Sequence, residues 1–392
     1  MKTYEMMSED FLRQVREWRQ HLHANPELGF EEFNTAKMVA DILRSLNIEV
    51  HENIAGTGVV GVLKKGNSNK SIAIRADMDA LPMQELNSFE HCSIQKGKMH
   101  ACGHDGHTAI LLGAAKYLSE FGRFDGTVYF VFQPAEENKG GGKAMVEAGL
   151  FERFDIDEIY GLHNWPGRAL GEICINDGAM MASFDIFDIR LQGVGAHAAM
   201  PHLGKDPIVA GAALITQLQA IVSRQISPLD SAVLSITQFE GGDTYNIIPG
   251  VARLKGTIRA FDDNVRLLLK HQLTAAVASL EHTTGVKGIL DYQECYPATI
   301  NDSDCAKKAR NIAASAFGDG KVFSDVLPTM ASEDFSFMLN QKKGAYIWLG
   351  VDEVDKPSVA LHNPYYDFND NALPIGIKLW AALVEGSLAV KN

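Results

Sequence analysis

The stretch MHACGHDGH, residues 99–107, brings one thiol and three imidazoles together within a short segment. Apolar residues at helical spacing follow it, from Thr108 to Phe121. Cys102 and His104 are both good ligands for a metal of borderline softness, and a helix N-terminus favours a thiolate over a thiol. A buried cysteine and a histidine can also form a C-x-H pattern by coincidence, so the rest of the chain must decide between these interpretations.

Composition narrows the class of protein. The chain has 392 residues, 46% hydrophobic and 22% charged, which is ordinary globular composition and long enough for two domains. A formal net charge of −13 argues against nucleic acid and anionic membranes as partners. Five scattered cysteines suit a reducing compartment. Without an apolar signal-peptide core or a run long enough to span a membrane, we expect a cytoplasmic protein.

The N-terminal part alternates predicted helices and strands, which is typical of a layered α/β domain. Apolar residues at helical spacing cover residues 8–24, which Ser8 can cap, and about 34–46. Short β-branched runs then predict strands at 48–50, 57–63 and 71–75. The run GTVYFVFQ (126–133) is apolar on both faces, which predicts a central strand.

Carboxylates stand at the ends of two of these strands, where open α/β sheets usually build their sites. Asp77 and Asp79 close the third strand, and Glu136 and Glu137 come directly after the strand 126–133. Adjacent carboxylates cannot share one direction, so one glutamate could bind a metal while the other accepts a proton. The alternative in both cases is a solvated acidic turn.

Two histidines occupy comparable positions. His163 follows a predicted strand at 156–162, and His362 lies downstream of another at 346–351, each in a Leu-His-Asn sequence. The candidate metal ligands are therefore Cys102, His104, one glutamate of the acidic pair, His163 and His362. Each is weak evidence alone, but several at strand ends of one sheet indicate a metal site.

The middle of the chain is predicted to run strand, helix, strand, strand, helix, strand, which is the order of a ferredoxin-like unit. These elements are expected at 184–193, 206–225, 232–239, 251–260, 262–284 and 286–295. Helices are expected again at 302–317, 332–339 and 371–390. We therefore predict one α/β domain formed by 1–180 and 293–392, with a domain inserted at 181–292.

A series of motifs runs in order along nearly the whole chain. They are RADMDALP (75–82), MHACGHDGH (99–107), FQPAEE (132–137), LHNWP (162–166), GVGAHAAMPHLGKDPI (193–208), NIIPG (246–250), GTIRA (256–260), ASEDF (331–335) and LHNP (361–364). Together they resemble the dinuclear metallopeptidases of the carboxypeptidase G and aminoacylase type. The most similar branch holds hippurate hydrolases, N-acyl-amino-acid amidohydrolases and auxin-conjugate hydrolases.

This resemblance implies a layered α/β/α metallopeptidase domain with an inserted ferredoxin-like (βαββαβ) lid domain, through which such proteins commonly form dimers. It also implies two divalent metal ions per chain, and manganese, zinc, cobalt and nickel are all chemically acceptable. Cys102 matches a thiolate that bridges the two metals, where other branches have an aspartate. The remaining ligands match His104, Glu137, His163 and His362.

The resemblance also implies roles for other polar residues. Glu136 matches the general base, and Asp79 matches the carboxylate beside the metal centre. Asp77 stands where other branches keep a metal-binding histidine, and His104 would supply that imidazole instead. Positions that reach the substrate match His197, Asn246 and Arg259 in the inserted domain. No role follows for His100, His107 and His202, which we expect to be structural or to support the metal ligands from behind.

The expected reaction is hydrolysis of the amide bond of N-acyl amino acids, either hippurate-like or N-acetylated. Glu136 would take a proton from a metal-activated water and deliver it to the departing amine. His197 could donate to the oxyanion, and the forked guanidinium of Arg259 suits a free α-carboxylate. A dipeptidase or carboxypeptidase on the same scaffold is the alternative.

Two other classes of function remain open from the sequence. Cys102 could be a covalent nucleophile with a histidine base, although the paired glutamates and distant histidines would then have no task. The cluster could also be a structural zinc site, but such sites are closed and rarely include a spare carboxylate.

Overall fold

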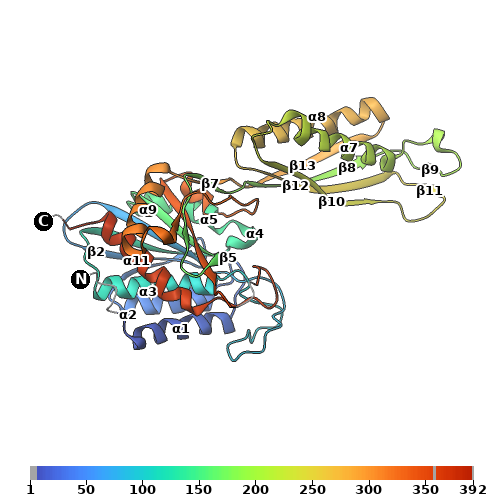
Figure 1. Ribbon diagram of the computed structural model, residues 1–392. Helices are drawn as coiled ribbons and strands as arrows, with labels where there is room; N and C mark the ends of the chain where they lie inside the picture. The colour runs from blue at the N-terminus through green and yellow to red at the C-terminus, as the bar shows by residue number, and fades with distance from the viewer. Residues whose placement is uncertain (1–6, 356–358, 391–392) are drawn as a thin grey trace. The chain divides into compact units, whose positions relative to one another are not determined.

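The computed structural model describes residues 7–355 and 359–390, which form two compact units, each with its own hydrophobic core (Figure 1). The first unit consists of Met1–Met180, Ile300–Leu327 and Asp334–Asn392. The second consists of Met181–Thr299 and Pro328–Glu333. A single segment of the chain, with six residues added from further on, is thus inserted into the first unit.

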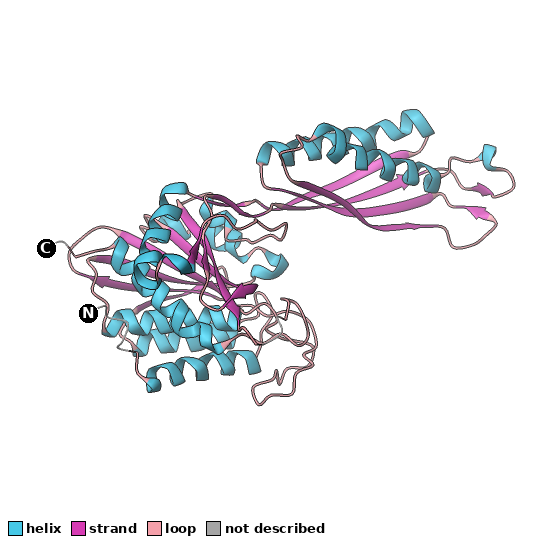
Figure 2. Ribbon diagram, viewed as in Figure 1, coloured by secondary structure: helices cyan, strands magenta, loops and turns pink. Residues whose placement is uncertain are grey.

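The first unit is built on an eight-stranded sheet with the order β1-β2-β4-β3-β5-β16-β6-β15 (Figure 2). Its strands are β1 (Glu49–Ile54), β2 (Gly58–Lys65), β3 (Ser71–Asp77), β4 (Gly126–Gln133), β5 (Ile159–Ala169), β6 (Ile173–Cys174), β15 (Val322–Phe323) and β16 (Gly344–Asp352). β3 is parallel to both β4 and β5, and β5 is parallel to β16. The carboxyl ends of these four central strands therefore meet at one end of the sheet. This large mixed sheet confirms the predicted α/β class.

Long helices accompany the sheet: α1 (Glu9–Ala24), α2 (Phe33–Ser45), α3 (His104–Glu120), α9 (Ser303–Phe317) and α11 (Leu373–Ser387). α3 is buried along nearly its whole length and packs against α1, α2 and α11 (Figure 1). A Cβ atom on Gly113 would lie 2.5 Å from Ile377 of α11 and 3.2 Å from Val15 of α1. Glycine at this position therefore permits the close packing of three helices.

Shorter helices complete the first unit. They are α4 (Glu136–Lys139), α5 (Gly141–Glu147), α6 (Leu150–Arg153), α10 (Ser336–Leu339), η3 (Asp319–Lys321) and η4 (Asp370–Ala372). Strands β7 (Gly178–Met181) and β14 (Thr299–Asn301) form a separate two-stranded sheet. α1 begins after Ser8, whose hydroxyl accepts a hydrogen bond from the Phe11 N–H at 3.2 Å, as the sequence predicts.

Three predicted element boundaries are wrong. The helix expected from Thr108 begins at His104, because Gly103, with φ 93°, provides the left-handed turn from which the helix starts. The strand expected to end at 162 continues to Ala169, so His163 lies inside β5 rather than after it. The helix expected at 332–339 is only the single turn α10.

The second unit has a four-stranded antiparallel sheet with the order β10-β12-β8-β13. Its elements are β8 (Phe184–Gln192), β9 (Ala196–His197), η2 (Pro201–Leu203), α7 (Pro207–Gln225), β10 (Ala232–Gly241), β11 (Ile247–Ile248), β12 (Val251–Ala260), α8 (Asp263–Thr284) and β13 (Lys287–Tyr296). β9 and β11 form a small sheet of their own, and α7 and α8 pack together against the larger one. The main elements follow the βαββαβ order that the sequence predicts.

Both long helices of this unit begin at an aspartate. Asp206 accepts from the Ile208 N–H at 2.8 Å, and Asp262 accepts from the Asn264 N–H at 2.7 Å. Among the described helices, α7 is the one that is long and apolar enough to cross a membrane. It packs with α8 against the sheet of its own unit and buries one face there, which is sufficient reason for an apolar composition.

Candidate metal centre

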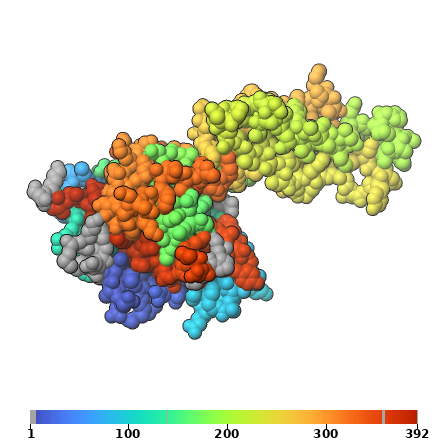
Figure 3. All heavy atoms as spheres, viewed as in Figure 1, coloured from blue at the N-terminus to red at the C-terminus, as the bar shows by residue number. Residues whose placement is uncertain are grey.

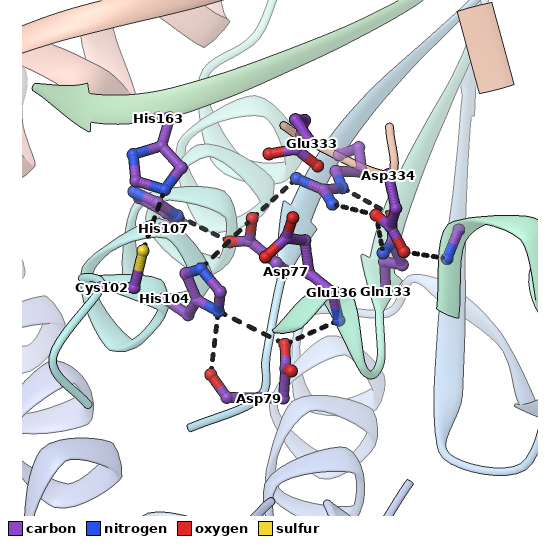
Figure 4. A network of polar contacts seen from close by, with 12 residues as sticks. Asp77, Asp79, Cys102, His104, His107, Gln133, Glu136, His163, Glu333 and Asp334 are labelled. Carbon is purple, nitrogen blue, oxygen red and sulfur yellow. Dashed lines mark hydrogen bonds and ion pairs between the residues drawn. The ribbon is translucent and has the colours of Figure 1, made fainter. Parts of the chain in front are cut away.

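The beginning of α3 carries two of the predicted ligands. Cys102 is buried, and its Sγ lies 3.4 Å from Nε2 of His163 in β5 (Figure 4). His104 is also buried, and its Nδ1 lies 2.8 Å from the main-chain carbonyl oxygen of Asp79. A ring nitrogen facing a carbonyl must carry the proton, so the lone pair of His104 is on Nε2. Nε2 has no hydrogen-bond partner among the described residues, and Asp77 lies 3.7 Å away.

Two further ligands come from segments on either side of this loop. Glu137 lies in α4, directly after β4, and its Oε1 is 3.0 Å from Nε2 of His362. His362 has φ 60°, a left-handed conformation that costs roughly 1–3 kcal/mol for a non-glycine residue. Its main-chain N–H donates to the carbonyl of Ala101 at 2.8 Å. This hydrogen bond fixes the strained histidine beside Cys102.

The ligand atoms fall into two groups that share one sulfur. Sγ of Cys102 and ring nitrogens of His104 and His163 lie within 4.8 Å of one another. The same sulfur, a carboxylate oxygen of Glu137 and a ring nitrogen of His362 form a second such group. Thiolate, imidazole and carboxylate are the donors that zinc and related divalent metals use in proteins. The donors present, and the unpartnered His104 Nε2, therefore fit a pair of divalent cations held on either side of Cys102.

Asp79 holds the turn that carries the two glutamates. Its Oδ1 accepts from the Glu136 N–H at 3.0 Å, and its Oδ2 accepts from the Glu137 N–H at 2.9 Å. Its main-chain carbonyl meanwhile orients His104. Asp79 thus contacts His104 and holds both glutamates at once.

Asp77 is held from two sides. Its Oδ1 lies 2.6 Å from Nδ1 of His107, and its Oδ2 accepts from Arg75 at 2.7 Å. The other ring nitrogen of His107 lies 2.6 Å from Oδ1 of Asn164 and 3.0 Å from its main-chain nitrogen. His107 therefore links β3 to β5 behind the ligands. No role for His107 was predicted, although its position three residues after His104 places both on one face of α3.

Arg75 extends this buried network toward the segment before α10. Its Nε donates to Gln133 at 2.8 Å, and its Nη2 donates to Asp334 at 3.2 Å. Asp334 also accepts from Gln133 at 2.7 Å and from the Gly142 N–H at 2.7 Å. Asp334 of the ASEDF motif therefore has a structural role, since it accepts hydrogen bonds from three segments of the first unit.

Burial and nearby charges shift the pKa values of the ligands in different directions. Burial lowers the pKa of His104, but the charges of Asp77 and Cys102 outweigh it and raise that pKa well above its ordinary value. Burial lowers the pKa of His163 well below its ordinary value and raises the pKa of the Cys102 thiol. Hydrogen bonds with Cys102 and Glu137 raise the pKa of His362 to about 10. A bound cation would require a thiolate and neutral imidazoles, so its binding would release protons.

The three residues predicted to contact substrate lie in the second unit, in two separate places. His197 pairs with Ile247 between β9 and β11, and the Asn246 carbonyl accepts from the Ala198 N–H at 3.0 Å. Arg259 lies near the other end of β12, where it donates to the Met330 carbonyl at 2.8 Å.

The distance between these two places follows from the length of β12. β12 begins at Val251, close in sequence to Asn246, and Arg259 comes eight residues later. At about 3.3 Å per residue, the strand carries Arg259 roughly 25 Å from its beginning. Within one chain, His197 and Asn246 therefore lie together, and Arg259 lies at the opposite end of the sheet.

Comparison with known proteins shows which family has this arrangement of residues. The model of peptidase family M20/M25/M40 matches residues 73–386. The hippurate hydrolase of Campylobacter jejuni is 44% identical over 365 residues, which cover 93% of this chain and 94% of that protein. IAA-amino acid hydrolase ILR1-like 4 of Arabidopsis thaliana is 39% identical over 371 residues, 93% of this chain and 83% of that protein.

Solved structures agree with the sequence matches. The Bacillus subtilis YXEP protein, described as a dinuclear metal binding peptidase from the M20 family, has a TM-score of 0.83 at 31% identity. The match covers 97% of this chain and 99% of that one. The resemblance seen in the motifs is thereby confirmed, and the chain belongs to peptidase family M20/M25/M40.

Proposed function

We propose that the protein is a metal-dependent amidohydrolase that cleaves the amide bond of N-acyl amino acids. The observation that carries the proposal is the pair of ligand groups around Cys102, with the carboxylate of Glu136 beside them. An oxygen of Glu136 lies within 4.8 Å of ligand atoms of His104 and Glu137, yet neither group around the sulfur needs it. The relatives named hippurate hydrolase and IAA-amino acid hydrolase support this class of substrate.

The donors are suited to two divalent cations, which when bound would lower the pKa of a shared water and polarise the substrate carbonyl. Manganese, zinc, cobalt and nickel are all compatible with thiolate, imidazole and carboxylate ligands. Glu136 takes the proton of the attacking water and later delivers it to the nitrogen of the departing amine. Asp79 contributes by holding the main chain of both glutamates, so that Glu137 can bind a cation while Glu136 transfers the proton.

We assign substrate contacts to the second unit, which would act as a lid. Arg259 would bind the free carboxylate, because a guanidinium offers several N–H donors and only one is used by Met330. His197 would donate to the oxyanion, and Asn246 lies beside it. A small substrate cannot span the distance between Arg259 and His197 within one chain, so we assign the two groups to different copies of a homodimer.

The surface of α7 supports an interface between lid domains. No charged residue occurs between Asp206 and Arg224, although a large part of this helix is exposed within its unit (α7 is yellow-green in Figure 3). Val209 in its first turn is 65% exposed. An uncharged, partly apolar helix face of this kind is typical of a surface that another copy covers. We place the dimer in the cytoplasm, where the five free cysteines would remain reduced.

A hydrolysis screen tests the proposed function. The purified protein, loaded with each candidate metal, would be given N-acetyl, N-benzoyl and N-succinyl amino acids alongside dipeptides. We expect N-acyl amino acids to be turned over, chelation to abolish activity and the added metal to restore it. Faster turnover of dipeptides would favour the peptidase alternative. Activity that survives chelation but not thiol alkylation would instead indicate Cys102 as a nucleophile.

A further inference from the structure

An N-terminal segment contacts the site loops at three points. We call residues 27–32 the N-terminal clamp. The Glu27 carbonyl accepts from the Ala80 N–H at 2.8 Å, directly after Asp79. The Gly29 carbonyl accepts from the Lys139 ammonium at 2.7 Å. Oε1 of Glu32 accepts from the Ala135 N–H at 2.8 Å, directly before Glu136.

The contact with Ala135 falls on a strained residue. Ala135 has φ 53° and ψ 44°, a left-handed conformation that is unfavourable for alanine. This conformation turns the chain from β4 into α4, so it determines the position of Glu136, the first residue of α4. The clamp is packed directly on this residue, because a Cβ atom on Gly29 would lie 3.0 Å from both Cα and Cβ of Ala135.

The side chain of Glu32 is unusual for a structural residue. It is fully buried, and no cation is among the groups that shift its pKa. Its second oxygen accepts from the Thr57 hydroxyl at 2.6 Å. Burial raises the pKa of Glu32 to about 7. Burying an acid without a cation costs free energy. The hydrogen bond of Glu32 with the Ala135 N–H therefore indicates a role beyond packing.

We infer that Glu32 is a positioning residue for amide hydrolysis: through the Ala135 N–H it holds the left-handed turn that aims the carboxylate of Glu136. The inference rests on the proposed role of Glu136 as the base. Glu32 does not touch the ligands, and the structure gives it no contact with a reacting group. Its effect reaches the reaction only through the main chain of Ala135.

Two conservative substitutions separate geometry from charge. Glu32→Gln removes the charge but keeps an oxygen that can accept from Ala135. Glu32→Asp keeps the charge but shortens the side chain, so that it cannot reach both Ala135 and Thr57. We expect the Gln variant to stay within about threefold of wild type on hippurate. We expect the Asp variant to lose 10-fold to 100-fold in kcat, with KM changed less than threefold and both metals retained.

Thr57→Val provides the matched control, since it deletes only the other hydrogen bond of Glu32. Its Tm should fall while kcat is kept. In the Asp variant alone, hydrogen exchange of a peptide covering residues 132–137 should become faster. A Gln variant as slow as the Asp variant, or an equal kcat loss in Thr57→Val, would overturn the positioning role. Loss of metal from the Asp variant would overturn it as well.

Glu136→Gln, measured in parallel, keeps this test separate from the proposed function. If Glu136→Gln retains a near-normal rate, the assignment of the base fails. If Glu136→Gln is inactive and Glu32→Asp turns over hippurate like wild type, only the inference about Glu32 fails.

Discussion

Arg19 and Asp105 form an ion pair of 2.9 Å in which neither side chain is accessible to solvent. Asp105 follows the candidate ligand His104 on α3, and Arg19 lies on α1, so the pair joins these helices next to the candidate metal centre. Arg19 also contacts Asp367 and lies 3.5 Å from Asp370. Removing Arg19 would leave the buried carboxylate of Asp105 without its guanidinium partner.

Arg19→Met should therefore be strongly destabilising. We expect a loss of about 3–5 kcal/mol in the free energy of unfolding, because Asp105 keeps a buried charge. Urea unfolding measures the loss. Arg13→Met is the control, since Arg13 lies on the same helix, is exposed and pairs only with exposed carboxylates, so it should cost less than about 1 kcal/mol. Equal losses of unfolding free energy in the two variants would show that the buried ion pair contributes no more to stability than an exposed one.

His23 should make stability depend on pH. Burial lowers its pKa, but Asp105 and Glu85 outweigh burial and raise it to about 9. A histidine with a raised folded-state pKa stabilises fully below the unfolded value of about 6.5, and that contribution is lost as the pH rises through 9. The shift corresponds to roughly 3 kcal/mol. The difference in unfolding free energy between wild type and His23→Gln, measured from pH 6 to 9.5, should shrink by an amount of that order. A constant difference would contradict the shift.

Glu136→Gln should retain both metals and substrate binding while kcat falls at least about 10²-fold to 10⁴-fold, because the amide cannot accept the proton. Metal analysis and steady-state kinetics check both statements. Glu137→Gln is the comparison, since it should lose metal as well as activity. A near-normal kcat in Glu136→Gln would assign the base to another group.

Cys102→Ser should lose at least one metal ion, since a neutral hydroxyl replaces a sulfur that both ligand groups share. Metal content after dialysis measures this. Cys92→Ser should keep full occupancy, because Cys92 belongs to neither group. Full occupancy in both variants would remove Cys102 from the bridging position.

Arg259→Ala should weaken hydrolysis of hippurate by about 2–5 kcal/mol in kcat/KM, and hydrolysis of hippuramide much less, because the amide lacks the carboxylate. Metal content should not change. Arg253→Ala on the same strand is the control, since Arg253 is exposed and pairs with Asp188. An equal loss on both substrates would show that Arg259 mainly supports the Met330 carbonyl.

The candidate ligands can be found from the sequence because they lie in short motifs within, at the ends of or between predicted strands. Cys102 and His104 can be recognised as candidate ligands by their donor atoms and spacing. The pair Glu136-Glu137 can be recognised by its position after a buried strand. Glu32 was not predicted, since a lone glutamate 103 residues before Ala135 carries no local signal of their contact. The sequence predicts His163 after the end of its strand, but β5 continues past it because β5 keeps pairing with β16 beyond position 162. Hydrophobic periodicity does not reveal this pairing.

Nδ1 of His104 lies 2.8 Å from the main-chain carbonyl oxygen of Asp79 and 3.3 Å from its carboxylate. No point substitution deletes a carbonyl, so the shorter of these two contacts survives a change of side chain at position 79. The carboxylate of the same residue can be altered alone, and with it the hold on the two glutamates. An engineer who changes residue 79 should therefore expect both Glu136 and the proposed ligand Glu137 to shift, while the carbonyl contact of His104 remains.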